Sequence, residues 1–369
     1  MNKNRFVHLT TAFLAVLACF LTAGTAWSEQ GRLLWQDTVD VSTFDQAFDV
    51  AALRDRVFVA GFVGVPGRGR DFLVRAYDAR MGTLLWQDRV DTGFDDFASG
   101  VVAEGKRVFV SGAVGSGCCT DWLVRAHDAE TGRLLWEDRF DQSGRRDSPR
   151  PGALAVSEGL LFVAGSADNL AVWVVRAYDA STGALVWQDQ FAEGSGAESL
   201  VVRRGRVFVG GFGKTNLSDD VLVRAYDART GTLLWQHRTS GPKTFLSTMR
   251  GLGSDGKRVF AGGTVANASG KQDFLVQAFD AETGTLLWQD QVDKGGDFDA
   301  AYGIALQGGR VFVQGSGEPR CLFDDSPPSD CDVLIRSYDA QTGALLWERE
   351  GGRAGGGGAQ GVGLPTGPR

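Results

Sequence analysis

A nine-residue stretch at 128–136, Asp-Ala-Glu-Thr-Gly-Arg-Leu-Leu-Trp, recurs along the chain and constrains its fold more than any other feature. Related copies stand at 78–86, 179–187, 227–235, 280–288 and 339–347, and a shorter copy, Gly-Arg-Leu-Leu-Trp, stands at 31–35. Successive tryptophans in these copies lie 48 to 59 residues apart. Repetition at such a period indicates an array of like units, each large enough for four short strands.

The unit at 98–140 shows how each copy is built. Apolar stretches at 98–103, 108–112, 122–127 and 134–140 predict four strands, which we letter a to d. Most of the connections are short turns, so we expect antiparallel neighbours. Strands b and c are apolar at nearly every position and need cover on both faces. Stacking like units around an axis supplies this cover, which predicts an all-β propeller of four-stranded antiparallel blades.

Three positions repeat from unit to unit and are expected to serve the blades. The tryptophan of each strand d is predicted to pack between neighbouring blades, at Trp35, Trp86, Trp136, Trp187, Trp235, Trp288 and Trp347. Strand c carries arginine at Arg75, Arg125, Arg176, Arg224 and Arg336, with Gln277 as the exception. The second residue after the tryptophan is aspartate at Asp37, Asp88, Asp138, Asp189 and Asp290, with His237 and Arg349 as exceptions. One arginine and one aspartate per unit predict a repeated ion pair, either across strands or between blades.

The pattern Ala-Tyr-Asp-Ala-x-Thr-Gly-x-Leu-x-Trp, as at 225–235, resembles the tryptophan-docking repeat of the pyrroloquinoline-quinone-like propeller superfamily. That superfamily includes periplasmic quinoprotein alcohol and glucose dehydrogenases and the scaffold lipoprotein of the outer-membrane β-barrel assembly machinery. The resemblance covers about residues 31–350 with six complete copies and implies the propeller fold. The motif itself carries no chemistry.

The sequence leaves the closure of the ring open. Family members usually have eight blades, whereas this chain has six complete repeats. Residues 31–35 would begin a further strand d, and Ala359–Leu364 resembles a strand a such as Ala301–Leu306. Either six blades close and these strands are peripheral, or a seventh blade is begun and left incomplete. We expect the first arrangement, followed by a flexible glycine-rich tail at 351–369.

The N-terminus is typical of a secretory signal. Lys3 and Arg5 precede an apolar run at 13–21 and then small residues. We expect residues 1–28 to be the signal and 29–350 the single propeller domain of a periplasmic or secreted protein. A lipid on Cys19 and an uncleaved anchor are the alternatives. Removing the two positive charges of the signal takes the net charge from −7 to −9, which argues against nucleic acid as a partner.

Four cysteines follow the predicted signal. Cys321 and Cys331 flank a proline-rich insert and are predicted to form a disulfide, as expected in an exported chain. The adjacent Cys118 and Cys119 lie in a loop between strands b and c. Some quinoprotein dehydrogenases carry an adjacent-cysteine disulfide against the quinone, so the resemblance implies that this pair contacts pyrroloquinoline quinone. A role in shaping the loop is the alternative.

Asp45, Asp96 and Asp299 align with one another just before strand a in three units. Converging carboxylates would hold a hard cation such as calcium, whereas turn caps or solvated loop residues are the alternative. No catalytic residues are recognisable.

The b–c and d–a loops vary between units while the opposite turns are uniform, and variable loops on a rigid scaffold usually bind. We therefore expect a binding or scaffold protein with a protein or envelope partner. The alternative is a pyrroloquinoline-quinone-dependent dehydrogenase with a small alcohol or sugar as substrate.

Overall fold

The computed structural model describes residues 33–39, 44–117, 119–142, 145–169, 171–214, 219–241, 247–295, 298–317 and 332–351. These residues contain 24 strands in six four-stranded sheets, and each sheet is a meander of antiparallel neighbours. The predicted all-β propeller with six complete blades is therefore confirmed. A search of the described residues for a helix that is long and apolar enough to cross a membrane finds none.

The blades follow one another along the chain. Blade 1 comprises β1 (Gln46–Leu53), β2 (Arg56–Val65), β3 (Gly69–Asp78) and β4 (Leu84–Val90). Blade 2 comprises β5 (Phe97–Glu104), β6 (Arg107–Gly115), β7 (Thr120–Asp128) and β8 (Leu134–Phe140). Blade 3 comprises β9 (Ser148–Ser157), β10 (Leu160–Ala167), β11 (Val172–Asp179) and β12 (Leu185–Phe191). Blade 4 comprises β13 (Gly194–Arg203), β14 (Arg206–Lys214), β15 (Asp219–Asp227) and β16 (Leu233–Thr239). Blade 5 comprises β17 (Thr248–Ser254), β18 (Arg258–Ala266), β19 (Gln272–Asp280) and β20 (Leu286–Val292). Blade 6 comprises β21 (Ala300–Gln307), β22 (Arg310–Gly317), β23 (Asp332–Asp339) and β24 (Leu345–Gly351).

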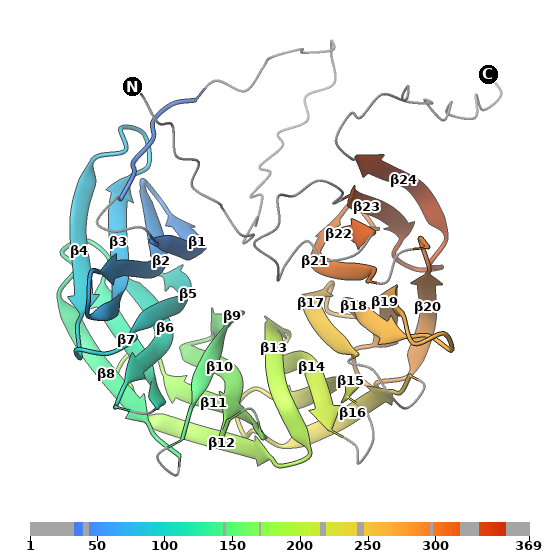
Figure 1. The fold of residues 1–369 in the computed structure, drawn as a ribbon. Helices are drawn as coiled ribbons and strands as arrows, with labels where there is room; N and C mark the ends of the chain where they lie inside the picture. The colour runs from blue at the N-terminus through green and yellow to red at the C-terminus, as the bar shows by residue number, and fades with distance from the viewer. Residues whose placement is uncertain are drawn as a thin grey trace.

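The six blades stand around a common centre (Figure 1). Strand a of each blade is innermost and strand d is outermost. Successive strands a contact one another from β1 to β5 and onward to β21, but no comparable contact joins β21 to β1 among the described residues. The described blades therefore form an open arc (Figure 1).

The hydrophobic core lies between blades, where strands b and c of one blade meet strands a to c of the next. Between blades 1 and 2, for example, Phe58 and Val74 pack in one cluster with Val101 and Val110, and Trp86 closes its outer side. Five such clusters join the six blades. Burying each Val or Phe side chain contributes about 1.5–3 kcal/mol, which explains why strands b and c are apolar on both faces.

The repeated tryptophan docks on the motif turn of the following blade. The Trp86 Nε1–H donates to the Ala129 carbonyl at 3.2 Å. Gly132 of the same turn has a φ of 73°, and a Cβ there would lie 2.7 Å from the Trp86 ring. The motif therefore needs glycine both for its left-handed backbone and for space. The same tryptophan-to-alanine bond is made by Trp35, Trp136, Trp187, Trp235 and Trp288.

Residues 33–39 dock on blade 1 as a strand d would. The Trp35 Nε1–H donates to the Ala79 carbonyl at 2.9 Å, and Asp37 pairs with Arg75 at 3.1 Å. Trp35, and not Trp347 of blade 6, therefore occupies the docking position of blade 1. The expected closure of six blades is not met, and the described residues show the alternative in which a seventh blade is begun.

The repeated ion pair joins neighbouring blades. Arg125 of blade 2 lies 2.6 Å from Asp88 of blade 1. The remaining pairs of this kind are Arg75–Asp37, Arg176–Asp138, Arg224–Asp189 and Arg336–Asp290. A tyrosine hydroxyl donates to the same aspartate at Tyr77, Tyr178, Tyr226 and Tyr338. Of the two arrangements that the sequence leaves open, the structure shows the pairing between blades.

Candidate functional site: the variable rim and the inner ring

The two ends of the propeller differ in regularity. At one end, which we call the motif rim, the a–b turn and the motif turn of each blade are joined by one backbone hydrogen bond, such as Ala228 N to Gly205 O at 2.9 Å. The motif aspartate caps its own turn, since Asp179 Oδ1 accepts the N–H groups of Ser181 and Thr182 at 2.9 Å. Hydrogen bonds from the Ser181 and Thr182 hydroxyls lower the pKa of Asp179 to about 2. These side chains serve the turn and are the same in kind from blade to blade.

At the opposite end, which we call the variable rim, the connections differ from blade to blade. The d–a connections run from two residues (192–193) to eight (240–247), and the b–c connections from three (66–68) to fourteen (318–331). A rigid scaffold that carries unequal loops on one end is the usual arrangement of a binding surface.

The aspartates at which calcium was predicted lie at the variable rim, in three different blades. Each accepts a backbone N–H within its own blade: Gly64 N to Asp45 (2.8 Å), Gly115 N to Asp96 (2.7 Å) and Lys294 N to Asp299 (2.6 Å). Asp147 of blade 3 has the same role. The structure does not gather Asp45, Asp96 and Asp299 around one point, and their contacts are those of loop caps.

Asp96 instead lies close to Asp71 and Asp91. These three form the one group of potential metal ligands among the described residues whose ligand atoms lie within 4.8 Å of one another. Asp71 is paired with Arg89, and Asp91 with Arg68 at 3.1 Å. Burial raises the pKa of Asp96, while its hydrogen bonds from Thr92 and Gly115 oppose this shift. The cluster is therefore already compensated by two arginines.

Cys119 is half-buried in the loop between β6 and β7, on the variable rim, and its carbonyl accepts the N–H of Ser116 at 2.9 Å. Cys118, Cys321 and Cys331 lie outside the described residues. The adjacent-cysteine site and the Cys321–Cys331 disulfide therefore stay predictions.

A second non-repeating feature lies on the innermost strands. Each strand a has a β-bulge near the variable rim, where one or more extra residues face a single partner in strand b. The bulge positions, which we call the inner ring, hold Phe48, Ser99, residues 150–153, Glu198, Arg250 and Tyr302. Bulges of this kind re-aim side chains and are common beside functional sites.

Inner-ring side chains contact one another from blade to blade. Arg150 Nε lies 3.0 Å from Glu198 Oε1, and the Arg250 guanidinium stacks over the Tyr302 ring at 5.6 Å. Arg250 makes no hydrogen bond or ion pair with any described residue, and its buried Nε–H has no acceptor there. Burial raises the pKa of Tyr302, so the phenol stays neutral beside this cation. The inner ring thus offers an uncompensated guanidinium to a ligand carboxylate or carbonyl.

Sequence reasoning missed the inner ring. Its signal is an unlike residue between a repeated alanine or methionine and a repeated apolar residue, as Glu198 stands between Ala197 and Leu200. The histidines, by contrast, have structural surroundings. His127 is fully buried between blades, with its Nε2 3.5 Å from Asp88, and His237 stacks on Phe279 at 4.7 Å.

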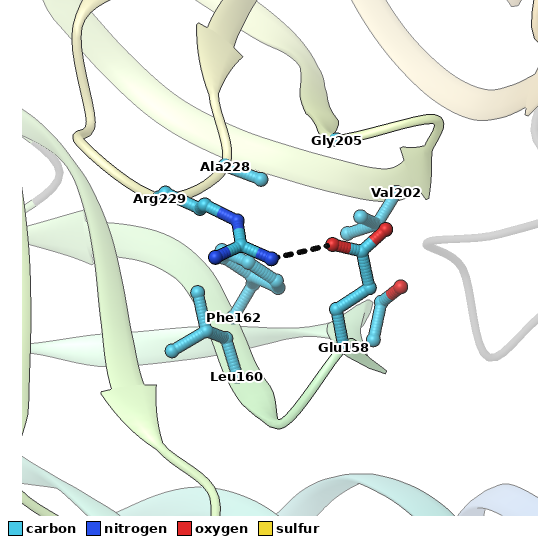
Figure 2. A pocket seen from close by; sticks show the side chains of 8 residues that line it. Glu158, Leu160, Phe162, Val202, Gly205, Ala228 and Arg229 are labelled. Carbon is cyan, nitrogen blue, oxygen red and sulfur yellow. Dashed lines mark hydrogen bonds and ion pairs between the residues drawn. The ribbon is translucent and has the colours of Figure 1, made fainter.

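A hollow with room for about one water molecule lies on the motif rim between blades 3 and 4. Arg229 and Glu158 pair across it at 3.5 Å, above Leu160, Phe162 and Val202 (Figure 2). It belongs to the packing between blades and lies at the end away from the variable rim.

Comparison with known proteins agrees with this architecture. Among solved structures, hydrazine synthase of Kuenenia stuttgartiensis is similar with a TM-score of 0.53 and 14% identity, over 81% of this chain and 80% of that one. The quinohemoprotein alcohol dehydrogenase ADHIIG of Pseudomonas putida HK5 has a TM-score of 0.52 and 15% identity, over 82% of this chain and 60% of that one. BamB of Moraxella catarrhalis has a TM-score of 0.47 and 16% identity, over 82% and 87%. At these identities the likeness shows the fold alone.

The chain spans less than two thirds of the dehydrogenase, and no curated protein matches it. The family model described as outer membrane protein assembly factor BamB matches residues 120–273 and 272–350, which together are more than half of the 369 residues. The chain therefore belongs to the pyrroloquinoline-quinone-like propeller repeat family that this model describes.

Proposed function

We propose that this protein is an exported propeller of the cell envelope, periplasmic or secreted, that binds a protein or another envelope component through its variable rim and inner ring. The observation that carries the proposal is the contrast between the two rims. The motif rim uses its polar side chains to close its own turns, whereas the variable rim has unequal loops around an inner ring that differs in every blade. The description of the matching family model, an outer membrane protein assembly factor, supports the same class of function.

The binding groups on this surface are polar and aromatic. Arg250 supplies an uncompensated guanidinium, Arg145 of the 141–147 loop is 60% exposed, and Phe44 beside β1 is 54% exposed. Arginine and aromatic side chains are enriched among residues that dominate the energy of protein interfaces. The surface therefore suits a partner that presents carboxylate or carbonyl groups beside apolar side chains.

A site-specific photo-crosslinker tests the assignment of the rim. Placed at Asp95 on the variable rim of the full-length protein in its own envelope, it should give a discrete adduct. Placed at Met81, which is 76% exposed on the motif rim, it should give none. The expected adduct should weaken at least tenfold in Arg250→Ala, on the basis that one good arginine contact contributes about 1.5–3 kcal/mol. Equal adducts from both rims, or adducts from Met81 alone, would overturn the proposal.

The alternative function is a pyrroloquinoline-quinone-dependent dehydrogenase. Its support is the fold shared with a quinohemoprotein alcohol dehydrogenase and the place of Cys119 in a loop of the variable rim. The calcium part of such a site does not fit Asp45, Asp96 and Asp299, because they cap loops in separate blades. Titrating the protein with the quinone and calcium, with the quinone absorbance and dye-linked alcohol or sugar oxidation as readouts, separates the two functions. Saturable binding with turnover would favour the dehydrogenase.

A further inference from the structure

The open end of blade 6 presents a face that every other blade buries. Two strand-c residues point toward the next blade in each unit, Phe274 and Val276 in blade 5, and both are fully buried. Their counterparts in blade 6, Val333 and Ile335, are 49% and 37% exposed. We call this surface, together with Ser337 and Trp347, the forward face of blade 6. An apolar face whose five equivalents are all covered indicates an occupant.

Polar groups on the forward face also lack the partners that their equivalents have. The indole N–H of Trp288 donates to Ala340 of the next blade, but that of Trp347 has no acceptor among the described residues. Ser337 replaces the alanine of the other blades, and its hydroxyl is fully buried without a hydrogen-bond partner in the described part of the chain. A buried hydroxyl without a partner costs about 1–3 kcal/mol.

The complete junctions show what covers such a face. Strand a of the following blade packs on strands b and c of the preceding one, as β21 packs on β18 and β19. Two side chains make the closest approach there. A Cβ placed on Gly262 of β18 would lie 3.2 Å from the Ala301 Cβ and 3.3 Å from the Ile304 Cδ1. The occupant must therefore offer alanine, a bulge residue, a small residue and then a branched apolar residue.

One segment outside the described residues has this order. Residues 359–364 read Ala-Gln-Gly-Val-Gly-Leu, against Ala-Tyr-Gly-Ile-Ala-Leu at 301–306 and Ala-Ser-Gly-Val-Val-Ala at 98–103. The distance in sequence agrees as well, because Ala359 follows Trp347 by 12 residues, as Ala98 follows Trp86 and Ala47 follows Trp35. We propose that residues 359–364 dock on the forward face of blade 6 as the innermost strand of a seventh unit. Its outermost strand is the segment 33–39 already seated on blade 1.

This proposal is independent of the partner-binding function, since it concerns a different surface. Ala359 and Val362 take the places of Ala301 and Ile304, and Gln360 takes the bulge position. The docked strand covers Val333 and Ile335 and brings backbone groups to the buried hydroxyl of Ser337. The predicted flexible tail is thereby shortened to the residues on either side of the strand.

A photo-crosslinker at Ile335 of the full-length protein tests the docking, with the adduct mapped by mass spectrometry. The expected product is an intramolecular link to residues 359–364. Val362→Asp should reduce its yield at least tenfold, because a carboxylate would replace the apolar anchor. The matched control, Gln360→Asp, should keep the yield within twofold, because the bulge position already holds Phe48, Ser99, Glu198, Arg250 and Tyr302 in other blades. A crosslinker at Val186, which is 46% exposed on blade 3, should give no link to this segment.

Three results would overturn the docking. A link from Ile335 to a second copy, seen as a dimer by light scattering, would assign the face to self-association. A link to another segment, or no link at all, would remove the tail as occupant. A link that is equally strong in Val362→Asp and Gln360→Asp would show that proximity rather than docking produced it.

Discussion

The junction between blades 4 and 5 differs from all the others in its polar contacts. Elsewhere an aspartate, an arginine and an aromatic or histidine partner meet, as Asp189, Arg224 and Tyr226 do between blades 3 and 4. Between blades 4 and 5 the three equivalent positions hold His237, Gln277 and Phe279. Gln277 there bonds Thr239 and Gln289, and His237 stacks on Phe279. The tryptophan docking is unchanged, with the Trp235 indole 3.2 Å from the Ala281 carbonyl.

The difference shows that the polar residues work as a set. A buried arginine without its aspartate would be an uncompensated charge, and a buried aspartate without its arginine likewise. At the neutral junction both charges and the hydroxyl are absent together, so no group is left unpaired by the exchange. The apolar docking is thus the constant part of each junction, and the ion pair is one of two ways to fill its polar part.

The largest effect should come from removing the constant part. Trp187→Ala in a charged junction and Trp235→Ala in the neutral one should each lower the free energy of unfolding by about 3–5 kcal/mol, because both indoles are buried and leave a cavity. Urea denaturation followed by circular dichroism measures both. Similar losses in the two variants would confirm that the docking is shared. A loss below 1 kcal/mol for either would contradict it.

A smaller but more discriminating effect should follow from removing the cation. Arg224→Met leaves Asp189 in the junction with only the Tyr226 hydroxyl as partner, and should cost about 3 kcal/mol. The matched change in the neutral junction, Gln277→Met, removes hydrogen bonds between neutral groups and should cost about 1 kcal/mol. Equal losses would show that the charge of Arg224 is of no consequence for the junction.

Transplanting the neutral set should restore most of that loss. The triple variant Asp189→His, Arg224→Gln, Tyr226→Phe converts the junction of blades 3 and 4 to the residues found between blades 4 and 5. We expect it to unfold within about 1.5 kcal/mol of the parent, because replacing a buried ion pair as a whole is often close to neutral. A triple variant less stable than Arg224→Met alone would contradict the view that the three residues are exchanged as a set.

How far the sequence predicts these features depends on repetition. The motif from Asp128 to Trp136 predicts the blade, its turn and the packing role of the tryptophan, because the same side chains recur in every unit. Gln277 and His237 stand out singly as exceptions, yet their relation appears only when strands 40 residues apart are placed on facing blades. The inner ring escapes for the opposite reason. It consists of bulge residues such as Arg250 and Tyr302, whose register is set by the pairing of strand a with strand b and by no repeated letter.

The smallest expected effect concerns the junction of blades 1 and 2, where His127 takes the place of tyrosine beside Asp88. Burial lowers the pKa of His127 below its ordinary value of 6.5, and Asp88 opposes this only in part. The unfolded chain therefore binds a proton at a higher pH than the folded protein does. The stability contributed by neutral His127 is complete above the unfolded pKa and is lost as the pH falls below 6.5 through the folded pKa. Burial lowers the pKa of His237 in the same direction.

Acidification from pH 7.5 to 5.5, a window in which ordinary carboxylates stay ionised, should thus lower the free energy of unfolding of the parent protein. His127→Tyr restores the residue found at Tyr178, whose hydroxyl donates to Asp138 at 2.9 Å, and should reduce this decline. His127→Tyr combined with His237→Gln should nearly abolish it, because no other histidine lies in the described residues. Urea titrations at several pH values measure the slopes. If His127→Tyr declined as steeply as the parent, His127 would not be held neutral in the fold, and the charged and neutral junctions would not differ in their response to acid in the way argued here.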